Sequence, residues 1–369
     1  MAPSGTMIVG TRKGVFILKS GKSGWRVVNH SHTAAAVPYA FHDHRNDRTW
    51  VSLDHGHWGS KIQRSADLGK HWTEIEAPKY PKRARTKPWT TGKPQPATLS
   101  YLWTITPGGD DEPNRLYLGT EPGGLFYSDD GGDSFRLNKG LWDHPSRFDG
   151  WFGGGRPLAG LHSIVVDPRD SRHVFVGVSC AGVFESTDGG TTWAPRNQGL
   201  LADFLPDPKA EVGHDPHYLD ACPADPDTMW QQNHCGIFRS TNGGRSWKPV
   251  SRQGEVAHFG FAVAVDEKDP DCAWVVPAVA DTHRFAVDGK LCVCGTTDGG
   301  KTWKAFRTGL PQKDCYDVAF RHALDRSHGT LAFGTTTGNL FFSPNRGRRW
   351  ETISHHLPPI YSVRFLKEG

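Results

Sequence analysis

One eight-residue pattern recurs along the chain and constrains its fold more than any other feature. Its consensus is Ser/Thr-x-Asp/Asn-x-Gly-x-x-Trp/Phe, where x is any residue. Six copies begin at Ser65, Ser128, Ser186, Ser240, Thr296 and Ser343. Short strand-like runs such as GVFE, LFY and NLFF precede the copies. Because repeated units bury their apolar faces by stacking on neighbours, this regularity predicts a repeat architecture.

Each copy has the chemistry of a tight turn between two strands. The Asp or Asn side chain is suited to accept hydrogen bonds from backbone N–H groups of the turn, and the Gly supplies a positive φ. The Ser or Thr hydroxyl can bond back across the turn, and the aromatic residue is expected to pack into the core of its unit. We therefore assign the pattern a structural role rather than a catalytic one.

The spacing of the copies predicts the number of units. Successive copies begin 47 to 63 residues apart, and a four-stranded propeller blade takes roughly 40–50 residues plus loop insertions. A weaker seventh copy runs from Ser20 to Trp25. The ring closes if the N-terminus supplies three strands of the last blade and residues 360–366 its innermost strand, which leaves no open sheet edge. The sequence thus predicts an all-β, seven-bladed β-propeller, a single domain over residues 1–369.

The six copies resemble the Asp-box of the bacterial BNR/Asp-box repeat family, whose members are sialidase-like propellers often named glycosyl hydrolases. The resemblance covers nearly the whole chain. It implies the seven-bladed fold and little about function, because sialidases, xyloglucan-acting glucanases, sorting receptors and photosystem assembly factors all carry the repeat.

Composition and charge exclude several classes of protein. The chain has 43 Gly, 26 Pro and 14 Trp, as expected for many short strands and turns, and its net charge of +4 is too small to indicate nucleic-acid binding. No apolar run approaches the 18 residues of a membrane span, and the N-terminus lacks the pattern of a secretion signal. Seven cysteines, without zinc or disulfide spacing, are expected to be free thiols. We expect a cytoplasmic protein with no membrane or nucleic-acid partner; its oligomeric state stays open.

A ligand site is expected at one mouth of the central channel, where each blade contributes the start of its innermost strand. Those strands are predicted to start at Tyr39, Tyr101, His162, His217, Phe261, Tyr316 and Tyr361. The loops between the second and third strands should bring to the same mouth His55, His57, Glu121, His234, Asp281, His283 and Arg12.

Histidines are enriched, at 19 in the chain, and several map to this mouth. His and carboxylates are the common ligands of zinc and similar divalent metals, so we predict a metal held by His162, His217 and His234. His57 or Glu121 is then the candidate general base and Tyr316 the proton donor. Candidate substrate-binding residues are Tyr39, Tyr101, Trp103, Arg12, His283 and Arg321. The alternative is that the histidines merely line a polar channel.

Two long loops are predicted to lie at the same mouth. Residues 77–98 carry six basic residues, no acid and five prolines, which would steer an anionic ligand or simply form a solvated loop. Residues 141–160 are rich in Gly and aromatics, which suits a flexible lid. Trp142 and Trp151 in this loop would either stack on a sugar or aromatic ring or pack the loop down.

Three functions remain open from the sequence. Sialidase activity is disfavoured because the Arg-Ile-Pro run and a convincing arginine triad are absent. The first hypothesis is a hydrolase- or lyase-like enzyme that acts on a small polar substrate at the His/Glu-lined mouth, with a divalent metal. The second is a glycoside hydrolase-like enzyme, in which Glu121 and Asp281 are candidate carboxylates. The third is a non-catalytic binding or assembly propeller. For the enzymes, we expect a small-molecule substrate that is anionic or a carbohydrate.

Overall fold

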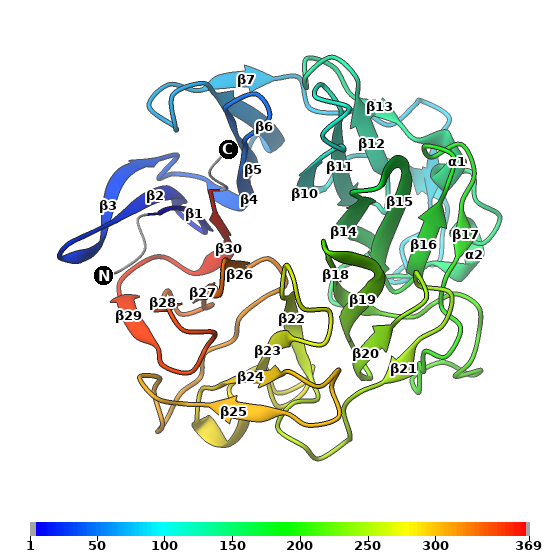
Figure 1. Cartoon of the computed structure of the whole chain (residues 1–369). Helices are drawn as coiled ribbons and strands as arrows, with labels where there is room; N and C mark the ends of the chain where they lie inside the picture. The colour runs from blue at the N-terminus through cyan, green and yellow to red at the C-terminus, as the bar shows by residue number, and fades with distance from the viewer. Residues whose placement is uncertain (1–4, 367–369) are drawn as a thin grey trace.

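The computed structural model describes residues 5–366 as a ring of seven antiparallel sheets, each with four strands (Figure 1). The predicted seven-bladed β-propeller is confirmed. The strands of each blade are given from the innermost outward. The first blade consists of β4 (Ala36–Asp43), β5 (Arg48–His55), β6 (Gly59–Ser65) and β7 (Thr73–Ile75), and the second of β10 (Tyr101–Pro107), β11 (Leu116–Glu121), β12 (Leu125–Ser128) and β13 (Arg136–Leu137). The third blade consists of β14 (Gly160–Asp167), β15 (Asp170–Ser179), β16 (Gly182–Ser186) and β17 (Ala194–Pro195).

The next three blades follow in chain order around the ring. The fourth blade consists of β18 (Pro216–Cys222), β19 (Asp225–Asn233), β20 (Gly236–Ser240) and β21 (Lys248–Pro249), and the fifth of β22 (Gly260–Val265), β23 (Ala273–Pro277), β24 (Val293–Thr296) and β25 (Lys304–Phe306). The sixth blade consists of β26 (Leu324–Ser327), β27 (Thr330–Gly334), β28 (Leu340–Ser343) and β29 (Glu351–Ser354). The remaining short elements lie in loops: the hairpin β8 (Arg85–Thr86) and β9 (Gln95–Pro96), and the helices α1 (Lys139–Trp142), α2 (Arg147–Gly150) and η1 (Val287–Gly289).

The seventh blade joins the two ends of the chain, as predicted. Its strands are β30 (Ile360–Phe365), β1 (Thr6–Thr11), β2 (Gly14–Gly21) and β3 (Gly24–Ser31). The red strand β30 lies beside the blue strand β1 in Figure 1, and Met7 pairs with Phe365. This pairing leaves no gap in the ring, so the inner strands of all seven blades surround one channel. None of the helices in residues 5–366 has the length and apolar character that crossing a membrane requires.

The six repeats form turns with a shared hydrogen-bond pattern. In the third copy, Ser186 Oγ donates to Asp188 Oδ1 at 2.8 Å and accepts from the Gly190 N–H at 2.8 Å. Asp188 Oδ1 also accepts from the Thr192 N–H at 2.9 Å. These bonds hold the pKa of Asp188 at about 2, the contact with Thr192 being the largest cause. The weak seventh copy differs, because Gly21 pairs directly with Gly24 in a two-residue hairpin.

The aromatic residues of the repeats join neighbouring blades, in addition to filling the core. The indole N–H of Trp247 donates to the Arg196 carbonyl oxygen of the preceding blade at 2.7 Å, and that of Trp303 donates to the Val250 carbonyl at 2.7 Å. Our expectation that each ring packs within its own unit is therefore incomplete. Each of these two indole rings lies where the preceding blade supplies a backbone carbonyl as the hydrogen-bond acceptor.

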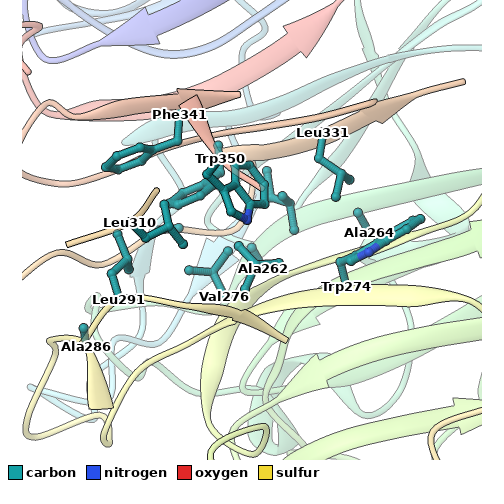
Figure 2. Close-up of a cluster of buried hydrophobic side chains, with 14 of the residues drawn as sticks. Ala262, Ala264, Trp274, Val276, Ala286, Leu291, Leu310, Leu331, Phe341 and Trp350 are labelled. Atoms are coloured by element: carbon teal, nitrogen blue, oxygen red, sulfur yellow. The ribbon is translucent and has the colours of Figure 1, made fainter. Parts of the chain in front are cut away.

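The hydrophobic core lies between blades rather than at the centre of the ring. Figure 2 shows one such cluster, in which Trp274 of β23 and Phe341 of β28 lie on either side of Trp350. Trp350 is 2% exposed and packs edge-on against Phe333, with ring centroids 4.9 Å apart. Truncation of such a buried aromatic costs about 3–5 kcal/mol. All seven cysteines are free, as expected, and only Cys235 is not fully buried.

One predicted strand start is wrong. The innermost strand of the sixth blade begins at Leu324, not at Tyr316, and residues 316–320 form no strand. The buried Asp317 explains the difference, since its carboxylate accepts hydrogen bonds from Thr337 Oγ1 and from Asn339 Nδ2. These side-chain bonds hold the segment in an irregular conformation before the strand begins.

Candidate functional site

A cavity of about 390 Å³ lies at the channel, and all seven blades or their loops contribute to its wall. The residues that line it include Asp54, Tyr101, Trp103, Ser179, Asp215, His217, His234, Phe261, Asp281, Arg284, Phe320, Arg321, His322 and Tyr361. Carboxylates, imidazoles, guanidinium groups and aromatic rings thus face one space. A concave site with few polar groups among aromatic walls is typical of a small-molecule binding site.

The loop 141–160 forms part of the cavity wall. Gly154, Gly155, Arg156 and Leu158 line the cavity. Trp142 and Trp151 are only 6% and 7% exposed, so of the two predicted roles for these rings they pack the loop down. The rim on this side is therefore held by buried aromatic side chains.

The basic loop 77–98 lies on the outside of that rim. The indole N–H of Trp89 donates to the Arg156 carbonyl at 3.3 Å, and Lys87 pairs with Asp149 at 2.7 Å. None of its residues is among those that line the cavity in the described part of the chain. This loop therefore supports the wall without reaching the ligand space itself.

Asp215 lies at the centre of the most concentrated polar cluster in the cavity. Its Oδ1 accepts hydrogen bonds from Ser179 Oγ at 2.8 Å and from the Cys180 N–H at 3.1 Å. Its Oδ2 lies 3.4 Å from His217 Nε2 and 3.6 Å from His234 Nδ1. One oxygen therefore anchors the carboxylate to the third blade, and the other faces two imidazole nitrogens.

The second nitrogens of the two imidazoles face different groups, and only that of His217 makes a hydrogen bond. His217 Nδ1 donates to the Gly260 carbonyl at 2.6 Å, and its ring stacks on Phe261 with centroids 4.7 Å apart. His234 Nε2 lies 4.0 Å from Asp281 Oδ2. His217 is buried at 3% exposure, whereas the side chain of His234 is 26% exposed on the cavity side.

The cluster shifts the protonation of each member. Burial alone would raise the pKa of Asp215, but the contacts with His217 and His234 outweigh burial and hold that pKa well below its ordinary range. Burial lowers the pKa of His217, with Asp215 opposing the change. The Asp215 carboxylate raises the pKa of His234. A buried carboxylate that stays ionised between two imidazoles has the donor chemistry of a metal or proton-transfer site.

Arg321 brings positive charge to the opposite wall. Its guanidinium carbon lies 5.1 Å from the Trp103 ring centroid and 5.6 Å from that of Phe261. Burial lowers the pKa of this guanidinium, and Asp215 opposes the change. Within residues 5–366, its buried Nε–H has no hydrogen-bond partner. An unsatisfied buried donor is costly, so this group is suited to receive an anion or a carbonyl oxygen of a ligand.

The structure brings together several of the residues that the sequence proposed for the site. They are the metal-ligand candidates His217 and His234, the substrate-binding candidates Tyr101, Trp103 and Arg321, and the candidate carboxylate Asp281. Their predicted roles are treated below as proposals.

His162 does not join His217 and His234, although the sequence placed it with them as a metal ligand. It is fully buried, its Nε2 donates to the Pro216 carbonyl at 2.8 Å, and its Nδ1 contacts Ser163 Oγ at 2.8 Å. Both nitrogens are therefore occupied, and the bond from Nε2 links the third blade to the fourth. Asp215 takes the position that the sequence assigned to His162.

The three catalytic candidates lie outside the lining of the cavity. Glu121 is buried and forms an ion pair with Arg156, while burial raises its pKa. His57 is exposed in the turn after β5, where its ring contacts Trp58. Tyr316 is 66% exposed, because its segment precedes the innermost strand instead of forming it.

The other three substrate-binding candidates also lie elsewhere. Tyr39 is buried and accepts a hydrogen bond from Arg364 Nε at 3.2 Å. Arg12 and His283 are exposed in loops and are not among the residues that line the cavity. A loop residue assigned to the mouth by its order in the blade can point away from the channel, which explains these differences.

Sequence reasoning missed Asp215 and Asp54 as wall residues. A signal for Asp215 was present, because it lies two residues before His217 at the start of β18. Side chains two residues apart on an extended chain point to the same face. No comparable local pattern marks Asp54, whose place depends on how the blades meet.

Comparisons with known proteins support the fold. No family model matches the chain. Xyloglucanase Xgh74A of Acetivibrio thermocellus is 27% identical over 279 residues, which are 66% of this chain and 28% of that protein. A xyloglucanase of a Paenibacillus species is 22% identical over 72% of this chain and 23% of its own length. The chain thus spans about a quarter of the length of these relatives.

A solved structure gives the same picture of the fold. The crystal structure of an ancestral GH74 enzyme superimposes with a TM-score of 0.59 at 17% identity, over 86% of this chain and 38% of that one. At that identity the likeness supports the propeller architecture alone. The chain is therefore a seven-bladed β-propeller with sequence similarity to xyloglucanases, and the BNR/Asp-box assignment stays a prediction.

Proposed function

We propose that this propeller is a glycoside hydrolase-like enzyme that binds an acidic saccharide in the channel cavity. The observation that carries the proposal is the composition of the cavity wall, where aromatic rings, carboxylates and an unsatisfied guanidinium group face one space of about 390 Å³. The similarity to xyloglucanases favours a carbohydrate over the other small polar substrates that the sequence left open.

Aromatic side chains supply the surface that a sugar ring needs. Tyr101 and Trp103 of β10 lie edge to face at the cavity, with ring centroids 5.7 Å apart, and Tyr361 of the seventh blade lines the same cavity. The apolar faces of a pyranose stack on such rings, while its hydroxyls need polar partners around them. The mixed wall of this cavity meets both requirements.

The arginines of the cavity wall indicate that the site prefers a negatively charged sugar. Arg321 offers a buried Nε–H without a partner among the described residues, and Arg284 lies beside it over the Phe261 ring at 5.2 Å. A guanidinium binds a carboxylate with two parallel hydrogen bonds, which makes it selective for that group. We therefore assign the substrate an acidic group, such as the carboxylate of a uronic acid residue.

The carboxylates that line the cavity supply the acid–base chemistry. Glycoside hydrolysis commonly uses two carboxyl groups on either side of the scissile bond. Asp54, on the first blade, and Asp281, on the fifth, approach the cavity from different sides and are both accessible. We assign the proton transfers to these two groups, with Asp54 close enough to Tyr101 and Tyr361 to affect their ionisation.

A binding panel tests the proposal. Purified protein is titrated by calorimetry with uronate-containing oligosaccharides and with neutral xyloglucan oligosaccharides, and products are separated by chromatography. We expect binding and cleavage of the acidic set, with binding lost in Arg321→Gln and retained in Arg348→Gln, a control in an exposed turn of the sixth blade. Asp54→Asn should lower kcat by about 10²–10⁴ with little change in KM. Binding of no saccharide, with the variants folded, would overturn the proposal.

A further inference from the structure

We infer that Asp215, His217 and His234 form a binding site for a divalent transition-metal ion of the zinc type, at the edge of the channel cavity. The ligand atoms are Asp215 Oδ2, His217 Nε2 and His234 Nδ1. This inference rests on the geometry of the cluster and does not require that the substrate is a saccharide.

The two separations of the carboxylate oxygen from the imidazole nitrogens match those of metal ligands. Ligands arranged tetrahedrally at about 2.1 Å from an ion lie about 3.4 Å from one another. The carboxylate oxygen is 3.4 Å from one imidazole nitrogen and 3.6 Å from the other, and all three atoms lie within 4.8 Å of each other. A good hydrogen bond between these groups would be 2.7–3.2 Å long. The atoms therefore converge at a spacing that leaves room for an ion between them.

Hydrogen bonds outside the cluster hold two of the three ligands, Asp215 and His217, in a binding orientation. Because the Gly260 carbonyl accepts the Nδ1 proton of His217, the Nε2 lone pair of the neutral ring faces the cluster. Ser179 and Cys180 bind the far oxygen of Asp215. The Asp281 carboxylate lies behind His234 at 4.0 Å. Such supporting contacts orient the ligands of metal sites and strengthen their basicity.

The cluster also has the openness of a reactive metal site. Structural zinc sites use four protein ligands, whereas sites that bind substrate or water use three and keep a position open. His217 is 3% exposed, but His234 faces the cavity with 26% of its side chain exposed. In residues 5–366, this is the single group of three His, Cys, Asp or Glu side chains whose donor atoms converge in this way.

The positive charges of the arginines that line the cavity, Arg156, Arg284 and Arg321, oppose a cation and must be outweighed. Arg321 lines the same cavity and interacts electrostatically with Asp215. The coordinating carboxylate supplies one negative charge to the ion, and the second carboxylate, Asp281, lies beyond His234. An ion with a net positive charge left after coordination would hold an anionic group of a ligand together with Arg321.

Metal titration of the full chain tests the inference without any sugar. The protein is freed of metal with a chelator and titrated with ZnCl₂ by calorimetry, and a Co²⁺-loaded sample is examined for the visible absorption of a tetrahedral site. We expect one equivalent of ion per chain and a tetrahedral cobalt spectrum. Saturation with Zn²⁺ at 100 times Kd should raise Tm by several degrees, by roughly 2 °C per kcal/mol.

His234→Ala is the decisive variant, because His234 is partly exposed and its loss leaves the anchored Asp215 in place. We expect its Zn²⁺ affinity to fall at least about 100-fold. His71→Ala is the matched control, since His71 also pairs with a carboxylate, at 2.6 Å from Asp67, but has no second imidazole. That variant should bind zinc as the unmodified chain does.

The cysteines provide a second control. Cys292 Sγ and Cys294 Sγ lie 4.0 Å apart and are soft donors that zinc favours. A double Cys292→Ala/Cys294→Ala variant should keep the ion. Failure of the unmodified chain to bind any of the ions, or equal binding by His234→Ala, would overturn the inference. Saccharide binding by the metal-free protein would leave the proposed function standing in either case.

Discussion

Two tryptophans at the same position of the repeat allow a sharp test of how the blades are joined. Trp247 and Trp350 are each 2% exposed and end the fourth and sixth copies. The indole N–H of Trp247 donates to the Arg196 carbonyl of the preceding blade at 2.7 Å. The indole N–H of Trp350 is buried without a partner in residues 5–366. Trp→Phe removes a similar apolar volume at both sites, so the difference between the variants isolates the hydrogen bond.

The size of that difference follows from the structure. Trp247→Phe loses a hydrogen bond worth about 1 kcal/mol and leaves the Arg196 carbonyl without that donor. Trp350→Phe removes an unsatisfied donor whose burial costs about 1–3 kcal/mol. We therefore expect the free energy of unfolding of Trp350→Phe to exceed that of Trp247→Phe by about 2–4 kcal/mol.

Urea denaturation followed by far-UV circular dichroism measures this difference. The midpoints should separate while the m-values stay equal, since both variants expose the same surface on unfolding. Equal midpoints, or a lower stability for Trp350→Phe, would refute the argument that the indole hydrogen bond joins one blade to the next. In that case the aromatic position would contribute through packing alone.

Three further predictions concern the cavity, the pH response and closure of the ring. Gly160→Ala places a methyl group 1.7 Å from the Trp103 ring, so the ring must move, and we expect a lower Tm and weaker ligand binding by calorimetry. The bond to Glu185 raises the pKa of His173. The stability that this bond contributes is thus present below the pKa of an unfolded histidine, about 6.5, and is lost as pH rises through the pKa of His173 in the folded protein. Urea midpoints should show that His173→Gln costs more stability at pH 6 than at pH 9; an equal cost would contradict this. A chain that lacks residues 360–366 exposes the edge of β1 and should aggregate in light scattering, whereas a monodisperse product would contradict the closure argument.

Local chemistry explains how much of the fold could be predicted. The hydroxyl, the Asp or Asn side chain and the glycine of each repeat form their turn within seven residues, so the pattern Ser186-x-Asp188-x-Gly190 is sufficient to indicate it. The spacing of such turns then predicts the number of blades. The closing strand was also predictable, because residues 360–366 are an apolar run that has no partner until it meets the N-terminus.

The site was predicted in part, for a different physical reason. His217 and His234 could be assigned to the mouth because they lie at the start of β18 and at the end of the adjacent β19. His162 lies near the start of the innermost strand of its blade, as His217 does in the next blade. Its ring nevertheless donates a hydrogen bond to the Pro216 carbonyl of that next blade. Whether a channel histidine faces the ligand or a neighbouring backbone depends on contacts between blades, which no local pattern reports.

The sequence by itself determined the all-β class and the seven blades, since both depend on interactions between residues that are near in the chain or repeated along it. The terminal closure followed from the count of strands, because the last blade lacks one strand until residues 360–366 supply it. Tertiary structure decided the site. Asp215 meets His234 only because β18 and β19 are neighbours in one blade, and Ser179 anchors it from another. Arg321 faces the same space from across the ring. Such juxtapositions arise from the packing of blades that are distant in sequence, and side-chain direction there is set by burial and by the partners available.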